Sequence, residues 1–316
     1  MRLTAVGVSG SVPGPRSAAS CYLVEAPVVA GVATVKSDLI TTTMPPLSSR
    51  LVLDLGSGAM GPLGVLASPT SLDAALISHL HPDHYLDLAP LYVYLKYQPV
   101  FGSNATGIAP HFPIWGPSGL AGKLGICSEK SAEIAEVFTV HTWPGPGANN
   151  SQATGSGDSI GTVTLPASTA RNTGNPLRFG DPVQIGPFAV ESAPAFHVIE
   201  AYAMRVTGPS SINPGQPANL VYTGDTDYSP AVVELARNAD VLLAEAAFTA
   251  AQYAASEPGV HLCGARAGQM AREAGVRQLI LTHIPPWNDP AEALTGARAE
   301  FGGTIDLAEP GQTFEI

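Results

Sequence analysis

The stretch that decides the fold is SHLHPDHYLDL, residues Ser78 to Leu88, which holds three of the 8 histidines of the chain. His79 and His81 lie two positions apart, and just past a strand this spacing lets both rings point the same way. Asp83 and His84 follow at the start of a predicted helix. Imidazoles and carboxylates suit zinc, iron or manganese. The stretch therefore predicts a metal site.

The flanks of this stretch support the same interpretation. AALIS, residues 74–78, is a short apolar run that predicts a buried strand ending at the histidines. After the cluster, apolar residues fall at the i, i+3, i+4 and i+7 positions of a helix, namely Leu88, Leu91, Tyr92 and Leu95. The histidines therefore lie in a strand-to-helix connection.

Three further ligand candidates each follow a predicted strand elsewhere in the chain. His197 follows FAVESAPAF, Asp225 lies in YTGDTDYSP, and His283 closes QLILTH. Taken singly, an aspartate in a turn usually caps it, and a histidine after a strand is usually just exposed. Taken together, the three complete two metal sites with the histidine cluster, because one carboxylate can bridge two ions.

Short apolar strands alternate with helices along the chain. Strands are predicted at residues 3–8, 51–58, 188–196, 201–206, 219–225, 241–246 and 278–283. A helix is predicted over residues 229–240, with Ser229 as N-cap and Pro230 in the first turn, and another over residues 264–276. Strands first and mixed βα units later predict an α/β fold in which helices enclose the sheets.

The domain organisation is predicted to be a single domain over residues 1–316, with insertions at about 27–50 and 144–180. The first insertion is predicted to be a β-hairpin extension. The second is polar and rich in Gly, Ser and Thr, which predicts a long and partly disordered surface loop. Neither gives a domain boundary, because the candidate ligands lie on both sides of the larger insertion.

Composition narrows the classes of function and the compartment. The net charge is −11 and no run of Lys or Arg occurs, so a basic stripe for a long polyanion is missing. No stretch approaches 18 apolar residues, and the N-terminus does not resemble a secretory signal, so no membrane contact is expected. The cysteines Cys21, Cys127 and Cys263 are too far apart for a CxxC site and suggest no disulfide framework. We expect a cytoplasmic protein.

The ordered motifs resemble those of the metallo-β-lactamase-fold hydrolases. H-x-H-x-D-H, a separated His, TGDT and LTHIPPW occur in the order of that family, and the similarity extends over most of the chain. The branch resembled is that of ribonuclease Z and its phosphodiesterase relatives. Within it, GPRSAASCYLVEA, HLCGARAG and THIPPW are most similar to atypical bacterial cyclic-nucleotide phosphodiesterases. The resemblance implies a four-layer αβ/βα sandwich with two mixed β-sheets.

The resemblance also implies a ligand set and a mechanism. It implies two divalent ions, zinc or alternatively manganese or iron, that activate a hydroxide to attack a phosphodiester. It implies that Asp83 also acts as a base, and that His261, paired with Glu245, donates a proton to the leaving oxygen. Asp54 is expected to be a supporting residue behind the ligands. The implied ligands are His79, His81 and His197 for one ion, and Asp83, His84 and His283 for the other, with Asp225 bridging.

The substrate implied first is a 3′,5′-cyclic nucleotide, cAMP, cleaved to the 5′-nucleoside monophosphate. The main alternative is tRNA 3′-end processing, and another small cyclic phosphate, acyl hydrolysis and a non-catalytic metal-binding scaffold are further alternatives. The arm by which ribonuclease Z grips tRNA normally precedes the GDT motif, where this chain has only Thr207 to Asn219 without Lys or Arg. Stable nucleic-acid binding is therefore not expected. The resemblance implies a homodimer, and Trp287 and Tyr85 are candidates to contact the base.

Overall fold

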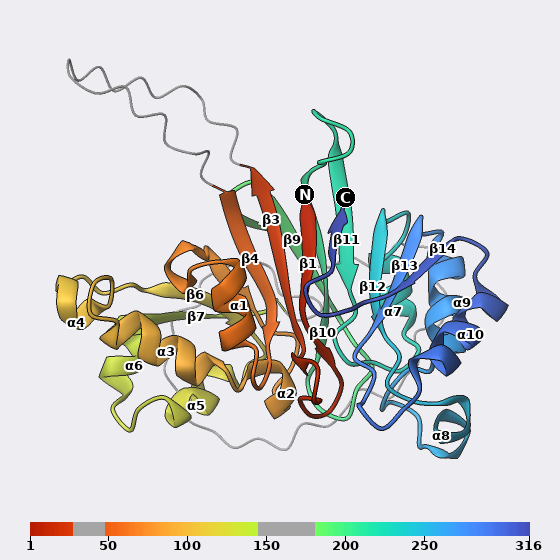
Figure 1. The fold of residues 1–316 in the computed structure, drawn as a ribbon, viewed down its shortest axis with the longest axis horizontal. Coiled ribbons are helices and arrows are strands. Elements are labelled where there is room, and N and C mark those ends of the chain that lie inside the picture. The colour runs from red at the N-terminus through yellow and green to blue at the C-terminus, as the bar shows by residue number, and fades with distance from the viewer. Residues whose placement is uncertain (28–47, 145–180) are drawn as a thin grey trace.

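The computed structural model describes residues 1–27, 48–144 and 181–316 (Figure 1). The two predicted insertions, at about 27–50 and 144–180, lie almost entirely outside the described residues. The hairpin and the surface loop predicted there therefore stay predictions.

Two mixed β-sheets form the centre of the molecule. In both sheets, antiparallel neighbours occur beside parallel ones. The first sheet has the order β15-β1-β3-β4-β5-β6-β7, with β2 beside β1: β1 (Arg2–Ser9), β2 (Ala18–Ala19), β3 (Cys21–Pro27), β4 (Ser48–Leu55), β5 (Ala74–Leu76), β6 (Phe112–Gly116), β7 (Phe138–Thr142) and β15 (Thr313–Glu315). The second sheet has the order β14-β13-β12-β11-β10-β9-β8: β8 (Val183–Ile185), β9 (Phe188–Pro194), β10 (Tyr202–Pro209), β11 (Pro217–Tyr222), β12 (Val241–Glu245), β13 (Gln278–Thr282) and β14 (Thr304–Leu307).

Helices cover the outer face of each sheet (Figure 1). The first sheet is covered by helices that precede residue 138, and the second by helices that follow residue 229. The first set is α1 (Met60–Leu66), α2 (Pro82–Tyr85), α3 (Leu88–Tyr97), α4 (Ser103–Thr106), α5 (Leu120–Lys123) and α6 (Ser131–Val137), with 3₁₀ turns at Pro69–Ser71 and Leu124–Ile126. The second set is α7 (Pro230–Leu235), α8 (Ala250–Ala255), α9 (Gly264–Ala274) and α10 (Pro290–Glu300).

The strands bury both faces, which is why they read as continuous apolar runs in the sequence. In β12, Val241 and Leu243 point to the layer between the two sheets, whereas Leu242 and Ala244 point to the layer under the helices. The buried layer between the sheets and the two layers under the helices give the order helix, sheet, sheet, helix. This is the four-layer sandwich predicted from the resemblance, and the fold prediction is confirmed.

One helix is shorter than its sequence predicts. Ser229 is its N-cap, its side chain accepting a hydrogen bond from the Val232 amide, and Pro230 begins α7, as predicted. The helix ends at Leu235, however, rather than near residue 240. Asn238 has φ +54, a left-handed conformation that no helix can continue through.

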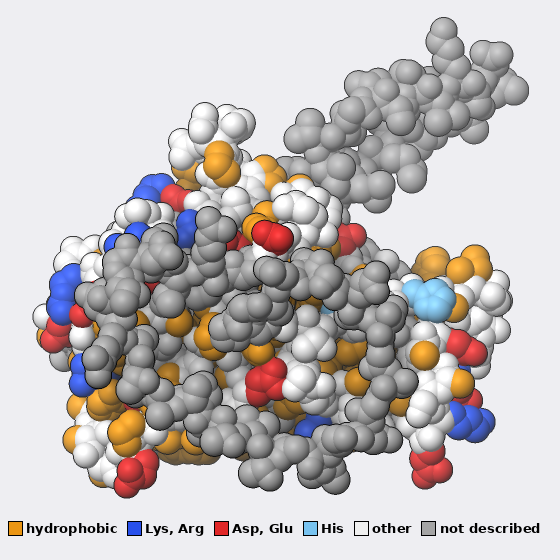
Figure 2. Space-filling model, turned by 180° about the vertical axis from the view of Figure 1, so that it is seen from behind, with side chains coloured by type: hydrophobic (Ala, Val, Ile, Leu, Met, Phe, Trp, Pro, Cys, Tyr) orange, Lys and Arg blue, Asp and Glu red, His pale blue; other side chains and the backbone are white. Residues whose placement is uncertain are grey.

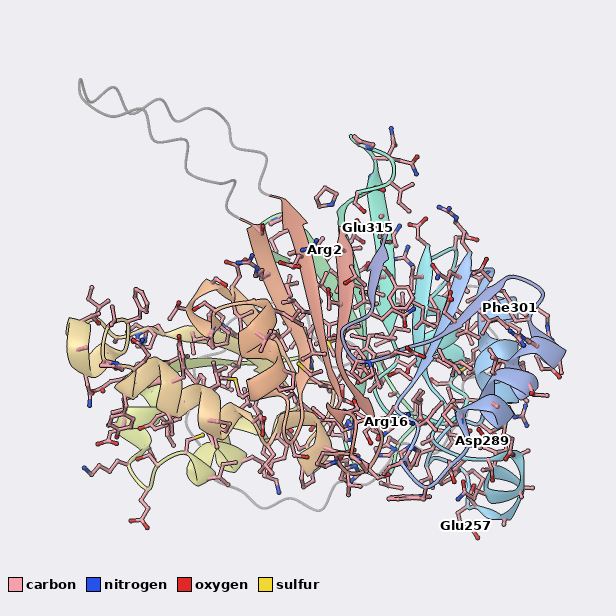
Figure 3. The ribbon with its side chains drawn as sticks, in the orientation of Figure 1. Arg2, Arg16, Glu257, Asp289, Phe301 and Glu315 are labelled. Atoms are coloured by element: carbon pink, nitrogen blue, oxygen red, sulfur yellow. The ribbon has the colours of Figure 1, made fainter. Side chains whose placement is uncertain are left out.

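The two ends of the sheets differ in what they carry. Figure 3 shows Arg2 and Glu315 at one end, and Arg16 and Asp289 at the other. Strands β1, β4, β5, β9, β11, β12 and β13 all finish at the end where Arg16 lies. Each candidate ligand follows one of the strands at this end, so one edge of the sandwich collects them.

On the face opposite to that of Figure 1, charged side chains of both signs are mixed. Figure 2 shows Lys and Arg side chains of the described residues mainly along one edge, interspersed with Asp and Glu. Many of them are paired there or elsewhere on the surface, such as Arg237 with Glu234 and Arg277 with Asp240. The side chains drawn on that face do not form a broad basic patch.

The layer between the sheets is expected to dominate stability. Leu243→Ala removes a fully buried side chain from that layer and should lower the free energy of unfolding by about 2–5 kcal/mol. Val65→Ala, at a side chain that is 86% exposed on α1, should change it by less than about 0.5 kcal/mol. Urea unfolding followed by circular dichroism measures both, and equal effects would contradict this assignment of the core.

Candidate metal centre

The structure brings all seven predicted ligands together at one edge of the sandwich. They form two groups, and within each group one candidate ligand atom per residue lies within 4.8 Å of the others. Asp225 belongs to both groups. The first group is His79, His81, His197 and Asp225, and the second is Asp83, His84, Asp225 and His283.

In the first group, three imidazole nitrogens converge on one point. Nδ1 of His81 lies 3.0 Å from Nε2 of His79 and 3.2 Å from Nε2 of His197. Nitrogens bound tetrahedrally to a zinc ion at about 2.0–2.1 Å would lie roughly 3.3 Å apart. The spacing of these three atoms therefore fits a metal ion.

In His79 and His197, the ring nitrogen that points away from the group, Nδ1, has a hydrogen-bond partner of its own. This partner fixes the tautomer of the ring and the orientation of Nε2. Nδ1 of His197 lies 2.7 Å from the carbonyl oxygen of Val260. A carbonyl can only accept, so Nδ1 carries the proton and Nε2 presents a lone pair. Nδ1 of His79 lies 3.1 Å from the hydroxyl of Ser78, whose own proton is donated to Asp54. His79 therefore also presents Nε2 as a lone pair.

In the second group, imidazole nitrogens converge on carboxylate oxygens. Nε2 of His84 lies 3.2 Å from Oδ1 of Asp225 and 3.4 Å from Oδ2 of Asp83. Nε2 of His283 lies 3.3 Å from the same Oδ1 of Asp225. The outer nitrogens are again held, Nδ1 of His84 by Asp54 at 2.7 Å and Nδ1 of His283 by the Ser20 hydroxyl at 2.8 Å. Ligating histidines are commonly oriented in this way.

Three buried polar atoms in the second group have no hydrogen-bond partner among the described residues. They are Nε2 of His84, Oδ1 of Asp225 and Nε2 of His283, and Oδ1 of Asp225 lies 3.2 Å from the first nitrogen and 3.3 Å from the second. A buried polar atom without a partner is costly. A cation among them would satisfy all three at once. The donor set and these orphaned atoms therefore fit a metal ion.

Asp225 faces both groups with different oxygens. Its Oδ1 lies against the second group, and its Oδ2 lies 3.6 Å from Nε2 of His79 in the first. The residue before it, Gly224, has φ +56, a left-handed conformation that favours glycine. A Cβ on Gly224 would lie 2.8 Å from Cβ of Ser78, beside the histidine cluster. The glycine of TGDT thus allows the Asp225 carboxylate to approach the histidines.

Backbone strain marks the same edge. His283 has φ +56 and Asp54 has φ +55, and neither is a glycine. Such conformations persist where surrounding contacts hold them, and they often occur at functional sites. Pro82 begins α2 and places Asp83 and His84 in its single turn. The short helix turns both side chains into the centre, as the sequence predicts.

Asp54 supports the histidine stretch from behind. It is fully buried, and its carboxylate accepts hydrogen bonds from the Ser78 amide, the Ser78 hydroxyl and the Tyr222 hydroxyl, each at 2.7 Å, besides its contact with His84. It does not belong to either ligand group. This is the supporting position that the sequence suggests for it.

The electrostatics of the two groups differ. Burial, followed by the charge of His84, lowers the pKa of His79 well below its ordinary value, and burial lowers the pKa of His197 to about 4. These imidazoles are therefore neutral at neutral pH, the form that binds metal. Burial also disfavours a charge on His84, but the carboxylates of Asp225 and Asp54 outweigh it and raise its pKa. The imidazole pKa values of the two groups are therefore shifted in opposite directions, down at His79 and His197 and up at His84.

The predicted proton-donor pair lies beside the ligand groups. Nδ1 of His261 is 3.0 Å from Oε1 of Glu245, and the His261 ring lies 5.3 Å from that of His197 and 5.9 Å from that of His283. Burial disfavours a charged His261, but Glu245 and then Asp225 raise its pKa to about 9. Glu245 is fully buried and accepts hydrogen bonds from the amides of Thr226 and Ala247. This pair can therefore hold a proton near the site.

Several contacts at the centre were not predicted from the sequence. Ser20, Tyr222 and the Val260 carbonyl hold the outer atoms of ligands or of Asp54. Ser20 lies in GPRSAAS, a segment that the resemblance includes, but nothing in that segment indicates contact with a histidine 263 positions later. A backbone carbonyl such as that of Val260 leaves no signal in the sequence at all.

Other histidines and the candidate base contacts lie outside the two groups. His111 is exposed, and His141 stacks on Trp115 with ring centroids 4.2 Å apart. Tyr85 is buried, whereas Trp287 is 62% exposed. The three cysteines are free thiols, as expected.

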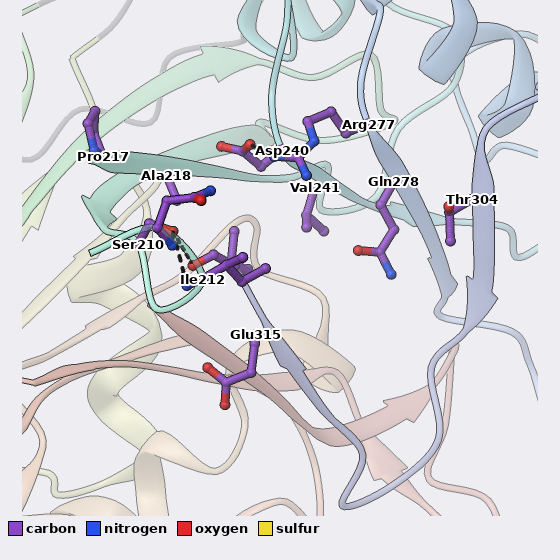
Figure 4. A pocket seen from close by; sticks show the side chains of 12 residues that line it. Ser210, Ile212, Pro217, Ala218, Asp240, Val241, Arg277, Gln278, Thr304 and Glu315 are labelled. Carbon is purple, nitrogen blue, oxygen red and sulfur yellow. Dashed lines mark hydrogen bonds and ion pairs between the residues drawn. The ribbon is translucent and has the colours of Figure 1, made fainter. Parts of the chain in front are cut away.

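A cavity of about 400 Å³ lies away from the metal centre. Figure 4 shows Asp240, Val241, Arg277 and Gln278 among its lining, at the beginnings of β12 and β13. Glu245 and the candidate ligand His283 lie at the other ends of these two strands. The cavity therefore does not belong to the centre.

Asp54→Asn should weaken metal binding without touching a ligand. An amide has one acceptor oxygen, so it cannot accept all the hydrogen bonds that the carboxylate accepts, and His84 loses its fixed direction. We expect metal affinity to fall by about 10- to 100-fold, measured by competition with a chromophoric chelator. Asp73→Asn is the control, since the exposed Asp73 carboxylate accepts from the Arg50 amide. Equal affinity of the two variants would contradict the role of Asp54.

Comparison with known proteins shows relatives over the whole length. No family model matches the chain. An uncharacterised protein of Mycobacterium tuberculosis is 34% identical, covering 100% of this chain and 92% of that protein. The probable metallo-hydrolase YhfI of Bacillus subtilis is 24% identical over 100% of both. Ribonuclease Z of Myxococcus xanthus is 26% identical over 85% of this chain and 89% of that protein.

Solved structures share the fold. The crystal structure of the metallo-β-lactamase-fold protein YhfI from Bacillus subtilis has a TM-score of 0.68 at 23% identity, covering 100% of this chain and 99% of that one. The short form of human tRNase Z has a TM-score of 0.64 at 19% identity, with the same coverage. This chain therefore belongs to the family of the mycobacterial protein, has the metallo-β-lactamase fold, and is similar to the probable metallo-hydrolase YhfI and to ribonuclease Z.

Proposed function

We propose that the chain is a phosphodiesterase that hydrolyses 3′,5′-cyclic nucleotides, cAMP first among them, to 5′-nucleoside monophosphates. The observation that carries this proposal is the His261–Glu245 pair, 3.0 Å apart and adjacent to both ligand groups. Hydrolysis of a cyclic nucleotide releases a sugar alkoxide, which leaves readily only when it is protonated. The pair lies beside the candidate ligands His197 and His283, where it would donate that proton.

Two divalent ions are proposed, with zinc first and manganese or iron as alternatives. One would be held by His79, His81 and His197, the other by Asp83, His84 and His283, with Asp225 between them. When bound, such ions lower the pKa of a water molecule and neutralise the charge of phosphate oxygens. The buried carboxylates of Asp54, Asp83, Asp225 and Glu245 would repel a phosphodiester unless cations neutralised their charge.

The side chains of the chain then have distinct roles. The hydrogen bond and charge of His84 overcome the effect of burial and lower the pKa of Asp83 to about 2, so this carboxylate is ionised, the form that can bind a cation. We propose as its second role that it accepts a proton from a water molecule. His261 uses Nδ1 for Glu245, which leaves Nε2 to donate to the leaving oxygen. Glu245 is held by two amides and keeps the imidazole oriented.

Exposed apolar side chains next to the ligands support a substrate with an aromatic part. Phe196 is 44% exposed and Val198 is 53% exposed, and they flank His197 in the chain. Trp287 is 62% exposed and follows His283 by four positions. A purine can stack on such surfaces. We propose Trp287 as the first candidate to contact the base.

Processing of tRNA is the second candidate, and the similarity to ribonuclease Z of Myxococcus xanthus favours it. Two observations weigh against it. Strands β10 and β11 pair directly as a hairpin, with Thr207 opposite Asn219 and Pro209 opposite Pro217, so the expected arm is missing between them. The net charge of −11 also disfavours binding of a polyanion.

Location and oligomeric state are also part of the proposal. The helices of the described residues include none with the length and apolar character needed to cross a membrane. A cytoplasmic location and a homodimer remain predictions from the sequence and its resemblance.

The number of metal ions bound per chain should distinguish variants of the first group from variants of the shared ligand Asp225. We expect two ions per chain for the wild type, one for His197→Ala, and fewer than one for Asp225→Ala, because Asp225 faces both groups. Elemental analysis after gel filtration measures this. His141→Ala is the matched control, as it removes an imidazole outside the groups and should retain two ions. An unchanged content in Asp225→Ala would contradict the shared site.

Activity should follow the same residues. Protein loaded with zinc or manganese is incubated with cAMP, and chromatography should show 5′-AMP. His81→Ala and Asp225→Ala should lose the activity, whereas Asp240→Asn, in the cavity at the far end, should keep it. Precursor tRNA is tested in parallel. Cleavage of tRNA without turnover of cAMP would replace the first proposal by the second.

A further inference from the structure

We propose that Asp227 is a positioning residue that holds the segment Gly259–His261, and through it the proton donor, against the metal centre. This inference rests on the proposed role of His261 as the donor to the leaving oxygen. Asp227 lies two positions after the bridging ligand Asp225 in TGDTD, and it does not belong to either ligand group.

The Asp227 carboxylate is buried and joins three parts of the chain. Its side chain accepts hydrogen bonds from the Tyr253 hydroxyl at 2.9 Å, the Gly259 amide at 2.9 Å and its neighbour's amide, that of Tyr228, at 2.6 Å. Its own amide donates to the carbonyl of Phe196 at 2.7 Å. One residue therefore links the TGDTD turn, helix α8, the loop after α8 and the loop that carries His197.

Three consecutive residues, Gly259, Val260 and His261, each make one contact that depends on the position of this loop. Gly259 is bound by Asp227 itself. The carbonyl oxygen of the next residue, Val260, accepts a hydrogen bond from Nδ1 of the candidate ligand His197 at 2.7 Å. The residue after that, His261, faces Glu245 at 3.0 Å. A shift of Gly259 would therefore move the partner of a metal ligand and the proton donor together.

The loop has a second restraint at the same glycine. Gly259 has φ +86, which is strained for other residues, and a Cβ there would lie 2.7 Å from the Phe196 ring. The backbone thus lies directly on Phe196, with Asp227 on its amide. Contacts of this kind fix the position of a loop but do not touch the substrate, so Asp227 is not itself a catalytic group.

The chemistry of the leaving group separates this role from a general effect on folding. A sugar alkoxide needs a proton to leave, whereas 4-nitrophenolate leaves without one. A variant that misplaces His261 should therefore lose activity on cAMP and keep it on bis(4-nitrophenyl) phosphate. A variant that only weakens the fold or the metal site should lose both activities in proportion.

The experiment compares Asp227→Asn, Tyr253→Phe and His261→Ala at saturating metal, with metal content measured for each. Asp227→Asn keeps the size of the side chain but leaves one acceptor oxygen for several donors. We expect its kcat on cAMP to fall by about 10- to 100-fold, with little change on bis(4-nitrophenyl) phosphate. His261→Ala should show the same split with a larger loss, of about 100-fold or more.

Tyr253→Phe removes only the hydroxyl that donates to Asp227 and should show the split at smaller amplitude. It carries the test if Asp227→Asn does not fold. Asp240→Asn is the matched control, because the Asp240 carboxylate also accepts a backbone amide, that of Asn219 at 2.9 Å, but at the far end of the sheet. It should leave both activities unchanged.

Each outcome is informative. Equal losses on both substrates in Asp227→Asn, or no loss on either, would overturn the positioning role while the phosphodiesterase proposal stands. A wild type that hydrolyses bis(4-nitrophenyl) phosphate but not cAMP would instead overturn the proposed substrate. Absence of a split in His261→Ala would remove the proton donor and, with it, the role of Asp227.

Discussion

The buried carboxylate of Asp54 is the contact on which the rest of the centre depends. It lies at the end of β4 and accepts hydrogen bonds from Ser78 after β5, from His84 in α2 and from Tyr222 on β11. These partners belong to both sheets. The group that orients a candidate ligand is thus also a polar link between the two sheets. Fully satisfied polar networks of this kind specify one arrangement of a core.

The charge of the centre couples the site to the fold. Buried carboxylates and imidazoles with unpartnered atoms face one another where the two sheets meet, and the ligands come from both halves of the chain. His197 and His283 belong to the second sheet, whereas the histidine stretch belongs to the first. Cations held between them would bind the halves together, and their affinity would then contribute to the free energy of folding.

The sequence predicts the architecture and the convergence of the seven candidate ligands, because both depend on local patterns. Apolar runs mark strands buried on both faces, and ligands directly after strand ends must meet at one edge. Contacts made by backbone atoms or by distant hydroxyls are different. Ser20 meets His283 across 263 positions, and Val260 offers only its carbonyl, so no residue type signals either contact. The early end of α7 likewise depends on a single left-handed residue, Asn238.

The pairing of β15 with β1 has a consequence for the order of events on the ribosome. The histidine stretch leaves the exit tunnel well before the second sheet exists, and the edge partner of β1 comes later still. During synthesis, the nascent chain therefore displays half of a chelating site with an open strand beside it. An unpaired strand edge is a template for pairing with another chain. The two ligand groups are complete only once β13 has been made and His283 follows it.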